Sequence, residues 1–202
     1  MKLYTLGISI ILLAGCVSIP KNSNHTGSLW VTVSSKDEFT DQTTKMVTVG
    51  ERRSNHLLIT QSLHFYPFVG VQNGEIYVGV RSGGPVRIPV GTIQLRIDDN
   101  PAWTITPAET PVFLAPNTPA VVNSMQEQIM NNMSKAMSPY TATTGDKARR
   151  IIKEIVHGRR IKYRNVGFNQ AASTTGEVEI DGSFIKSLKE IGINPESFWQ
   201  FL

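Results

Sequence analysis

The sequence has 202 residues, of which 40% are hydrophobic and 18% are charged, a balance that permits a packed core and argues against wholesale disorder. The formal net charge is +4, too mild an excess for a dedicated nucleic-acid binder, so we expect no nucleic-acid partner. There is one cysteine, which excludes a disulfide framework and a zinc site built from paired cysteines.

The first fifteen residues have the order of a bacterial signal peptide. Met1 and Lys2 give a positive start, and a mostly apolar run follows from Leu3 to Leu13. This run has eleven residues and is roughly 16 Å long as a helix, whereas a helix that crosses a bilayer core needs about 20 residues. We therefore expect residues 1–15 to be a signal peptide that is removed from the mature chain.

The tetrapeptide Leu13-Ala14-Gly15-Cys16 resembles the lipobox of bacterial lipoproteins. The resemblance implies that the Cys16 thiol is diacylglycerated and that cleavage frees its amine for a further acyl chain. Several acyl chains, at about 0.8 kcal/mol per buried CH2, anchor a protein more firmly than one. The alternative is an ordinary signal peptide followed by a chance cysteine.

The segment after the cysteine predicts a tether and a location. Pro20 to Ser28 is polar and rich in turn-forming residues, so we expect residues 16–28 to be a lipidated tether between the membrane and the folded domain. Position 17 is Val, whereas Asp there retains lipoproteins in the inner membrane of enteric-type bacteria. We therefore expect the chain to be lipid-anchored in the cell envelope, at the outer membrane and facing the periplasm.

Residues 29–202 predict a single β-rich domain. Short runs of β-branched and aromatic residues recur about every eight to twelve residues, and Asn73-Gly74 is a strong hairpin signal. The predicted strands cover 29–33, 45–50, 56–61, 63–71, 76–80, 86–90, 92–98, 102–106, 159–166 and 176–180. We expect a mainly β fold with α additions (α+β), an antiparallel β-sandwich or barrel-like domain with two or three amphipathic helices.

A Pro-rich and helical insertion is predicted around residues 107–140. Four prolines between 107 and 120 predict an extended connection, and a helix is predicted over 125–137. Apolar side chains recur every fourth residue along this helix, at Met125, Ile129, Met133 and Met137. We favour the buried face of a helix packed on the sheet, and the alternative is an adaptable Met-rich contact surface. Two further helices are predicted over 146–156 and 184–191.

Four segments of the domain resemble a group of secreted envelope proteins around the invasion-associated locus B family and the type VI secretion-associated accessory proteins. They are the strand Trp30-Val31-Thr32-Val33, the loop Asp37–Asp41, the hairpin at Asn73-Gly74, and the stretch Val178–Leu188. The resemblance covers Leu29 to about Ile193 and implies a β-sandwich that ends in a strand and a short helix. Members often carry two cysteines, which this domain lacks, and the resemblance implies no catalytic residues.

Catalytic signatures are missing from the sequence. There is no Gly-x-Ser-x-Gly elbow and no phosphate-binding glycine loop, and acylation would leave no free cysteine. His25, His56, His64 and His157 do not converge in sequence, and Asp98-Asp99 is typical of a solvated turn. We therefore expect no catalytic residues, no metal, no cofactor and no enzymatic activity.

One basic cluster stands out, with eight cations in eighteen residues against Glu154 alone. Its members are Lys147, Arg149, Arg150, Lys153, Arg159, Arg160, Lys162 and Arg164. The candidate function is a patch for anionic lipid, lipopolysaccharide phosphates or an acidic envelope protein, and the alternative is an ordinary solvated face.

These features favour an envelope lipoprotein with a non-catalytic binding or assembly role toward another envelope component. One alternative is a surface-anchored inhibitor or exclusion factor, which would use a protruding segment at 107–140. The other is a hydrolase of the cell wall or of envelope glycans, which would need convergent carboxylates or a metal cluster.

Overall fold

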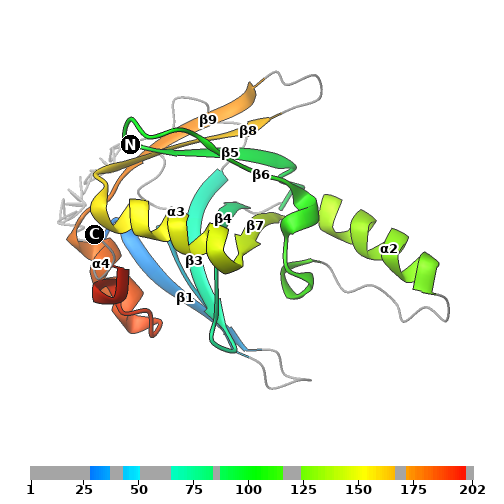
Figure 1. Ribbon diagram of the computed structural model, residues 1–202, viewed down its shortest axis with the longest axis horizontal. Coiled ribbons are helices and arrows are strands. Elements are labelled where there is room, and N and C mark those ends of the chain that lie inside the picture. The colour runs from blue at the N-terminus through cyan, green and yellow to red at the C-terminus, as the bar shows by residue number, and fades with distance from the viewer. Residues whose placement is uncertain are drawn as a thin grey trace, which may run out of the picture.

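The computed structural model describes residues 28–36, 43–50, 65–83, 87–115, 124–166 and 172–198. These residues form two antiparallel sheets and three α-helices, so the fold is α+β as the sequence predicts (Figure 1). The larger sheet has the strand order β1 (Trp30–Lys36), β2 (Thr43–Val49), β3 (Phe65–Gln72), β4 (Glu75–Ser82) and β7 (Tyr140–Thr144). The smaller sheet has the order β6 (Trp103–Ile105), β5 (Thr92–Ile97), β8 (Arg160–Val166) and β9 (Ala172–Glu179).

The helices follow or interrupt these strands. The α-helices are α2 (Ser124–Ala136), α3 (Gly145–His157) and α4 (Gly182–Glu190). Three short 3-10 helices are η1 (Pro107–Glu109), η2 (Val112–Leu114) and η4 (Pro195–Phe198). In Figure 1, α3 runs across the front of the two sheets, α4 lies at one end of the molecule, and α2 projects from the other end.

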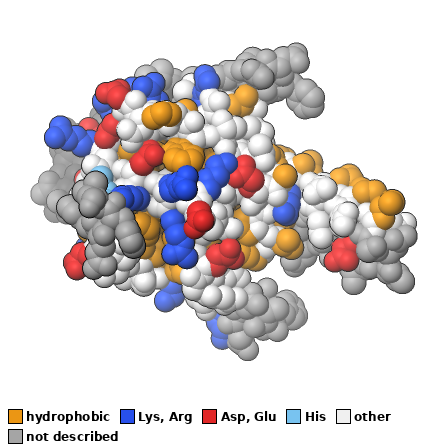
Figure 2. Space-filling model, viewed as in Figure 1, with side chains coloured by type: hydrophobic (Ala, Val, Ile, Leu, Met, Phe, Trp, Pro, Cys, Tyr) orange, Lys and Arg blue, Asp and Glu red, His pale blue; other side chains and the backbone are white. Residues whose placement is uncertain are grey.

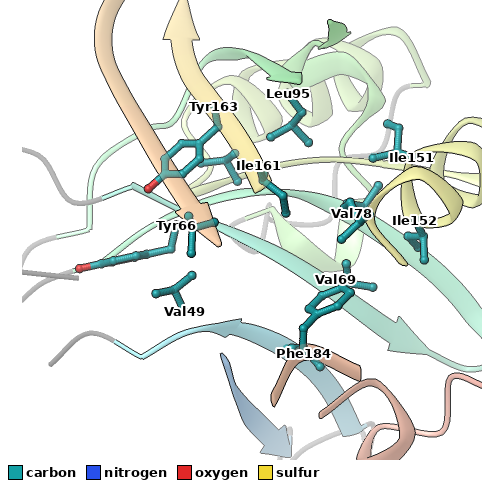
Figure 3. Packing of buried hydrophobic residues seen from close by; sticks show 14 of the residues in the cluster. Val49, Tyr66, Val69, Val78, Leu95, Ile151, Ile152, Ile161, Tyr163 and Phe184 are labelled. Carbon is teal, nitrogen blue, oxygen red and sulfur yellow. The ribbon is translucent and has the colours of Figure 1, made fainter. Parts of the chain in front are cut away.

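One face of the larger sheet forms the main core, and three separate elements cover it. Figure 3 shows Val69 and Val78 of this sheet facing Leu95 of the smaller sheet, Ile152 of α3 and Phe184 of α4. The opposite face of the larger sheet carries a second, smaller cluster. Its buried members are Met46, Phe68, Tyr77, Leu114 and Ala142.

In each element that covers the core, the buried residues are the ones that helical or strand periodicity predicts. In α3 the buried positions follow the i, i+3, i+4, i+7 spacing of one helix face; they are Ala148, Ile151, Ile152, Ile155 and Val156. In β8, Ile161 and Tyr163 are buried, while the residues that alternate with them, Arg160, Lys162 and Arg164, are exposed. In α4, Phe184 packs edge-on against Trp30 with ring centroids 4.8 Å apart, which fixes this helix on β1.

Two tyrosines each lie over a glycine on the neighbouring strand. Tyr77 is registered opposite Gly70, and Tyr163 is registered opposite Gly176. A Cβ atom on either glycine would come within 2.3 Å of the tyrosine ring, so both positions need a residue without a side chain. The Tyr163 hydroxyl also donates a hydrogen bond to the Phe65 carbonyl oxygen at 2.8 Å, which joins the two sheets.

The hairpin predicted at Asn73-Gly74 is confirmed. Asn73 has φ 51° and Gly74 has φ 80°, and Gln72 pairs with Glu75 across the turn. Positive φ at both central residues is the signature of a turn whose twist matches that of the flanking strands. The turn therefore sets the register of β3 and β4 at the centre of the larger sheet.

Three predictions of local structure are wrong. In the predicted strand 86–90, residues 87–90 form no strand, because the Val90 N–H donates to the Ser138 carbonyl oxygen rather than to a ladder. The connection predicted as extended over 107–120 contains η1 and η2 within its described part. The sequence also did not predict β7, which pairs with β4. The predicted strand 56–61 lies outside the described residues.

Because Ile152 of α3 is buried and Met133 of α2 is exposed, substitutions at the two positions should change the free energy of unfolding by different amounts. Replacing the fully buried Ile152 with Ala should lower the free energy of unfolding by about 2–5 kcal/mol, because it leaves a cavity between α3 and the sheet. Replacing the exposed Met133 with Ala should change it by less than about 0.5 kcal/mol. Urea unfolding of the full chain, followed by circular dichroism, measures both values. Equal losses would contradict the placement of α3 and α2.

Candidate functional site

Helix α2 is attached to the body through its polar side. It packs on η1 and η2, and the Lys135 ammonium donates a hydrogen bond to the Ala108 carbonyl oxygen at 3.0 Å. Met130, Asn131, Ser134 and Lys135 are half-buried, and their spacing puts these mostly polar side chains on one face of the helix. The helix therefore turns its apolar side away from the protein.

The predicted burial of the α2 apolar face is wrong. The exposed fractions are 69% for Met125, 54% for Ile129, 58% for Met133 and 63% for Met137. These four residues, here named the apolar ridge, recur every fourth position and extend for roughly 18 Å along the helix. An amphipathic pattern predicts one apolar face but not what that face meets, and here the polar face makes the contact with the body.

Exposed large hydrophobic side chains are concentrated on this part of the molecule. Of the seven in the described part of the chain, six lie between residues 112 and 137, and Val33 is the exception. The other two are Val112 and Phe113 on η2, which α2 contacts. Figure 2 shows hydrophobic side chains along the projecting helix. This concentration of exposed apolar side chains makes the segment a candidate contact surface.

The base of α2 is fixed to the larger sheet. Leu114 is buried against the second cluster, and Phe113 packs edge-on against Tyr77 with centroids 5.3 Å apart. The buried Ser138 hydroxyl, just after the helix, donates to the Leu114 carbonyl oxygen at 2.7 Å. Both ends of the segment that carries the apolar ridge are therefore held by the sheet.

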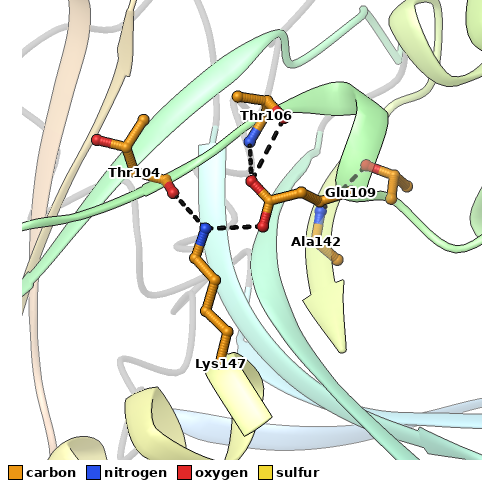
Figure 4. A network of polar contacts seen from close by, with 6 residues as sticks. Thr104, Thr106, Glu109, Ala142 and Lys147 are labelled. Atoms are coloured by element: carbon orange, nitrogen blue, oxygen red, sulfur yellow. Dashed lines mark hydrogen bonds and ion pairs between the residues drawn. The ribbon is translucent and has the colours of Figure 1, made fainter. Parts of the chain in front are cut away.

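A polar network ties η1 to α3 (Figure 4). The Lys147 ammonium lies 2.7 Å from Glu109 Oε2 and donates to the Thr104 carbonyl oxygen at 2.6 Å. The other carboxylate oxygen of Glu109 accepts the Thr106 backbone N–H at 3.0 Å. Burial alone would raise the pKa of Glu109, but the hydrogen bonds from Lys147, Thr106 and Thr143 and the charge of Lys147 outweigh it. The pKa of this carboxyl is therefore held below its ordinary value.

The eight cations of the predicted basic patch do not act as one surface. Lys147 is bound in the polar network with Glu109 and Thr104. On β8, Arg160 and Lys162 lie 2.9 Å and 3.9 Å from the carboxylate oxygens of Glu177, and Arg164 donates to Gln94 at 2.6 Å. The sequence did not show this pairing, because Glu177 is on β9 and reaches β8 only through the sheet register.

The remaining cations of the patch lie on or directly after α3. Arg149 and Arg150 are exposed, Lys153 is half-buried, and Arg159 is exposed at the start of β8. In the part of the chain that the structure describes, no ion pair or side-chain hydrogen bond engages the guanidinium groups of Arg149, Arg150 and Arg159. Figure 2 shows Lys and Arg side chains interspersed with Asp and Glu side chains across the front of the molecule. Whether the patch binds an anionic partner stays a prediction.

A hollow of about 560 Å³ lies between the second half of α3 and the turn from β5 to β6. Its lining residues are Asp98, Asn100, Trp103, Arg150, Lys153, Glu154, His157 and Gly158. A second hollow of about 590 Å³ adjoins it at Asp98 and includes Arg159 and Arg160. The first hollow could not be predicted from the sequence, because Trp103 and Glu154 are 51 positions apart.

Other classes of site were also sought in the described ranges. Within them, no group of three or more His, Cys, Asp or Glu side chains is placed to hold a metal ion. None of their helices combines the length and the apolar character needed to cross a bilayer. His25, His56 and His64 fall outside these ranges, as does Cys16. No family model, no curated protein and no solved structure matches this chain, so the resemblances noted from the sequence stay predictions.

The Glu109–Lys147 pair predicts a pH-dependent stability. The pKa of Glu109 is lower in the folded than in the unfolded state, so its carboxylate stabilises the fold above pH 4.5, its ordinary value. This contribution is lost as the pH falls through the folded-state pKa. Changing Glu109 to Gln should cost about 1 kcal/mol at pH 7, a modest value because both side chains are about one-third exposed.

The cost should shrink as the pH falls from 4.5 through the folded-state pKa, because the wild-type carboxyl is then protonated in the unfolded state and, at lower pH, in the folded state as well. Urea unfolding at pH 7 and pH 3 measures it. Glu127→Gln is the matched control, since it removes the same charge from an exposed position on α2. A pH-independent difference for Glu109→Gln would contradict the role of its charge.

Proposed function

We propose that the chain is a lipid-anchored protein of a bacterial cell envelope with a non-catalytic binding role. It contacts a protein component of the envelope through the apolar ridge of α2. The single observation that carries the proposal is the exposure of Met125, Ile129, Met133 and Met137 on a helix that projects from the body. A folded domain gains nothing from leaving four such side chains in water, so a partner that buries them explains their placement.

The position of α2 relative to the start of the domain supports this reading. The Trp30 backbone N–H donates to Ser183 of α4 at 3.0 Å, so the chain enters the body beside α4. Figure 1 shows α4 and α2 at opposite ends of the molecule. If Cys16 carries the lipid, the tether joins the body at the α4 end, and α2 extends from the far end toward other components of the envelope.

The chemistry of α2 favours a protein over a lipid surface as the occupant. Helices that lie in a membrane interface carry many Lys and Arg residues on their polar face. Helix α2 has one, Lys135, together with Glu127, and helical spacing puts both off the ridge. Apolar anchors one turn apart on an otherwise uncharged face are the form in which a helix enters a groove or packs on another helix.

A second candidate uses the same surface. A surface-anchored inhibitor or exclusion factor must present a protruding element to an incoming protein, and the projection of α2 from the insertion at 107–140 favours this reading. The two candidates differ only in whether the partner belongs to the same envelope.

The anchor is tested by changing Cys16 to Ala. We expect the change to abolish metabolic labelling with palmitate and to move the chain from the membrane fraction to the soluble fraction, because no acyl chain remains. Val17→Asp is the matched variant, which should keep the label and move the protein to the inner membrane in an enteric-type host. Labelling that survives in Cys16→Ala would refute the lipid anchor.

The ridge is tested by in-cell photocrosslinking from position 125, in the unaltered chain and in each variant. A variant with Ile129 and Met133 both changed to Glu, crosslinked from position 125, should lose the adduct, because two charges on the ridge cannot be buried against an apolar partner. The matched control changes Gln128 and Asn132 to Glu, which adds the same charges at the same spacing beside the ridge. The control should retain the adduct.

The adducts show whether the ridge is an interface and which molecule occupies it. Loss from the ridge variant alone supports a protein partner on the ridge. Equal adducts from both variants would remove the ridge from the interface. An adduct of twice the mass of the chain would identify a second copy as the occupant, and only lipid adducts would replace the protein partner with the membrane.

A further inference from the structure

The hollow between α3 and the β5–β6 turn has the size and the walls of a small-molecule site. Its volume is about 560 Å³, and ligand sites in proteins span roughly 300–1,000 Å³. The half-buried indole of Trp103 lines it together with the C-terminal half of α3, and the indole N–H is hydrogen-bonded to Glu154 of that helix. The hollow therefore combines an apolar surface with the cations of α3.

The two carboxylates of the hollow are engaged within the protein. Glu154 Oε1 accepts the Trp103 indole N–H at 3.0 Å, and Glu154 Oε2 accepts the Asn100 amide at 3.2 Å. Asp98 accepts the Arg159 backbone N–H at 3.1 Å. These bonds hold the indole and the turn in place, and they partly satisfy the negative charge of both side chains.

The donors that face the hollow come from α3. In the described part of the chain, no ion pair or hydrogen bond engages the Arg150 guanidinium, which offers five N–H groups. The His157 ring nitrogen Nδ1 lies 2.7 Å from the Lys153 carbonyl oxygen. A carbonyl oxygen only accepts, so Nδ1 is the donor in this contact. The Arg150 guanidinium is thus the charged donor in the hollow that is available to a ligand.

We infer that this hollow binds a small ring-shaped ligand that carries an oxyanion, such as a phosphorylated or carboxylated sugar. The planar guanidinium of Arg150 binds the oxyanion through paired hydrogen bonds, because its fork matches both phosphate and carboxylate. The indole of Trp103 supplies the apolar surface on which the ring lies. The site is separate from the apolar ridge and does not depend on the partner of α2.

The full chain, purified in a polyoxyethylene detergent that contains no sugar, is titrated calorimetrically with three probes. Glucose 6-phosphate tests the phosphate, glucuronate tests the carboxylate, and glucose is the neutral control. We expect both anions to bind at least about tenfold more tightly than glucose, because only they form charge-assisted hydrogen bonds with Arg150. No binding of either anion, or equal binding of all three probes, would overturn the inference.

Two variants locate the binding. Arg150→Gln should weaken the binding of glucose 6-phosphate at least about tenfold, because it removes the charged donor. Arg149→Gln is the matched control, since Arg149 is the adjacent exposed arginine and does not line the hollow. It should change the affinity less than twofold. Equal losses in the two variants would show general attraction by the basic face and would overturn a site at Arg150.

Discussion

The apolar face of the five-stranded sheet must be covered, and this requirement determines the place of nearly every other element. No single element in the described chain covers it, so the smaller sheet, α3 and α4 each bury a part. Because α3 turns Ile151, Ile152 and Ile155 toward the sheet, Arg149 and Arg150 on its other side face solvent. The basic surface of α3 is in the first place a consequence of packing, and any ligand that uses it takes advantage of charges already placed there.

Helix α3 also positions both candidate sites, through one side chain near each of its ends. Lys147 contacts the Thr104 carbonyl oxygen and Glu109, and so holds the segment that leads into η1. Helix α2 rests on η1. Glu154 holds Trp103 and Asn100, which form the wall of the hollow. The two anchoring points, at positions 103 and 104, are adjacent in the chain. A movement of α3 would therefore change the base of the apolar ridge and the shape of the hollow together.

The sequence predicts those parts of the structure that depend on local pattern. The alternation in β5 and β8 and the Asn73-Gly74 turn are local, and the structure has them where they are predicted. β7 escaped prediction because it has only five residues and lies between two helices.

The candidate sites were harder to predict, because they depend on contacts between distant residues. The pattern of α2 identifies an apolar face but not which side rests on η1. The pairing of Lys162 with Glu177, and of Trp103 with Glu154, exists only after the chain has folded. The lipid on Cys16 and a partner for the basic side chains stay predictions from the sequence.

Because the apolar side of α2 is not the attached side, the residues that stabilise the fold and the exposed residues of the ridge are different residues. Selection for a stable fold acts on the side chains that rest on η1 and on the buried Leu114 at the base. At the four ridge positions the side chains are mostly in solvent, so folding tolerates many replacements. Replacements at the ridge can therefore change the surface that α2 presents to solvent while the packing of the body stays the same.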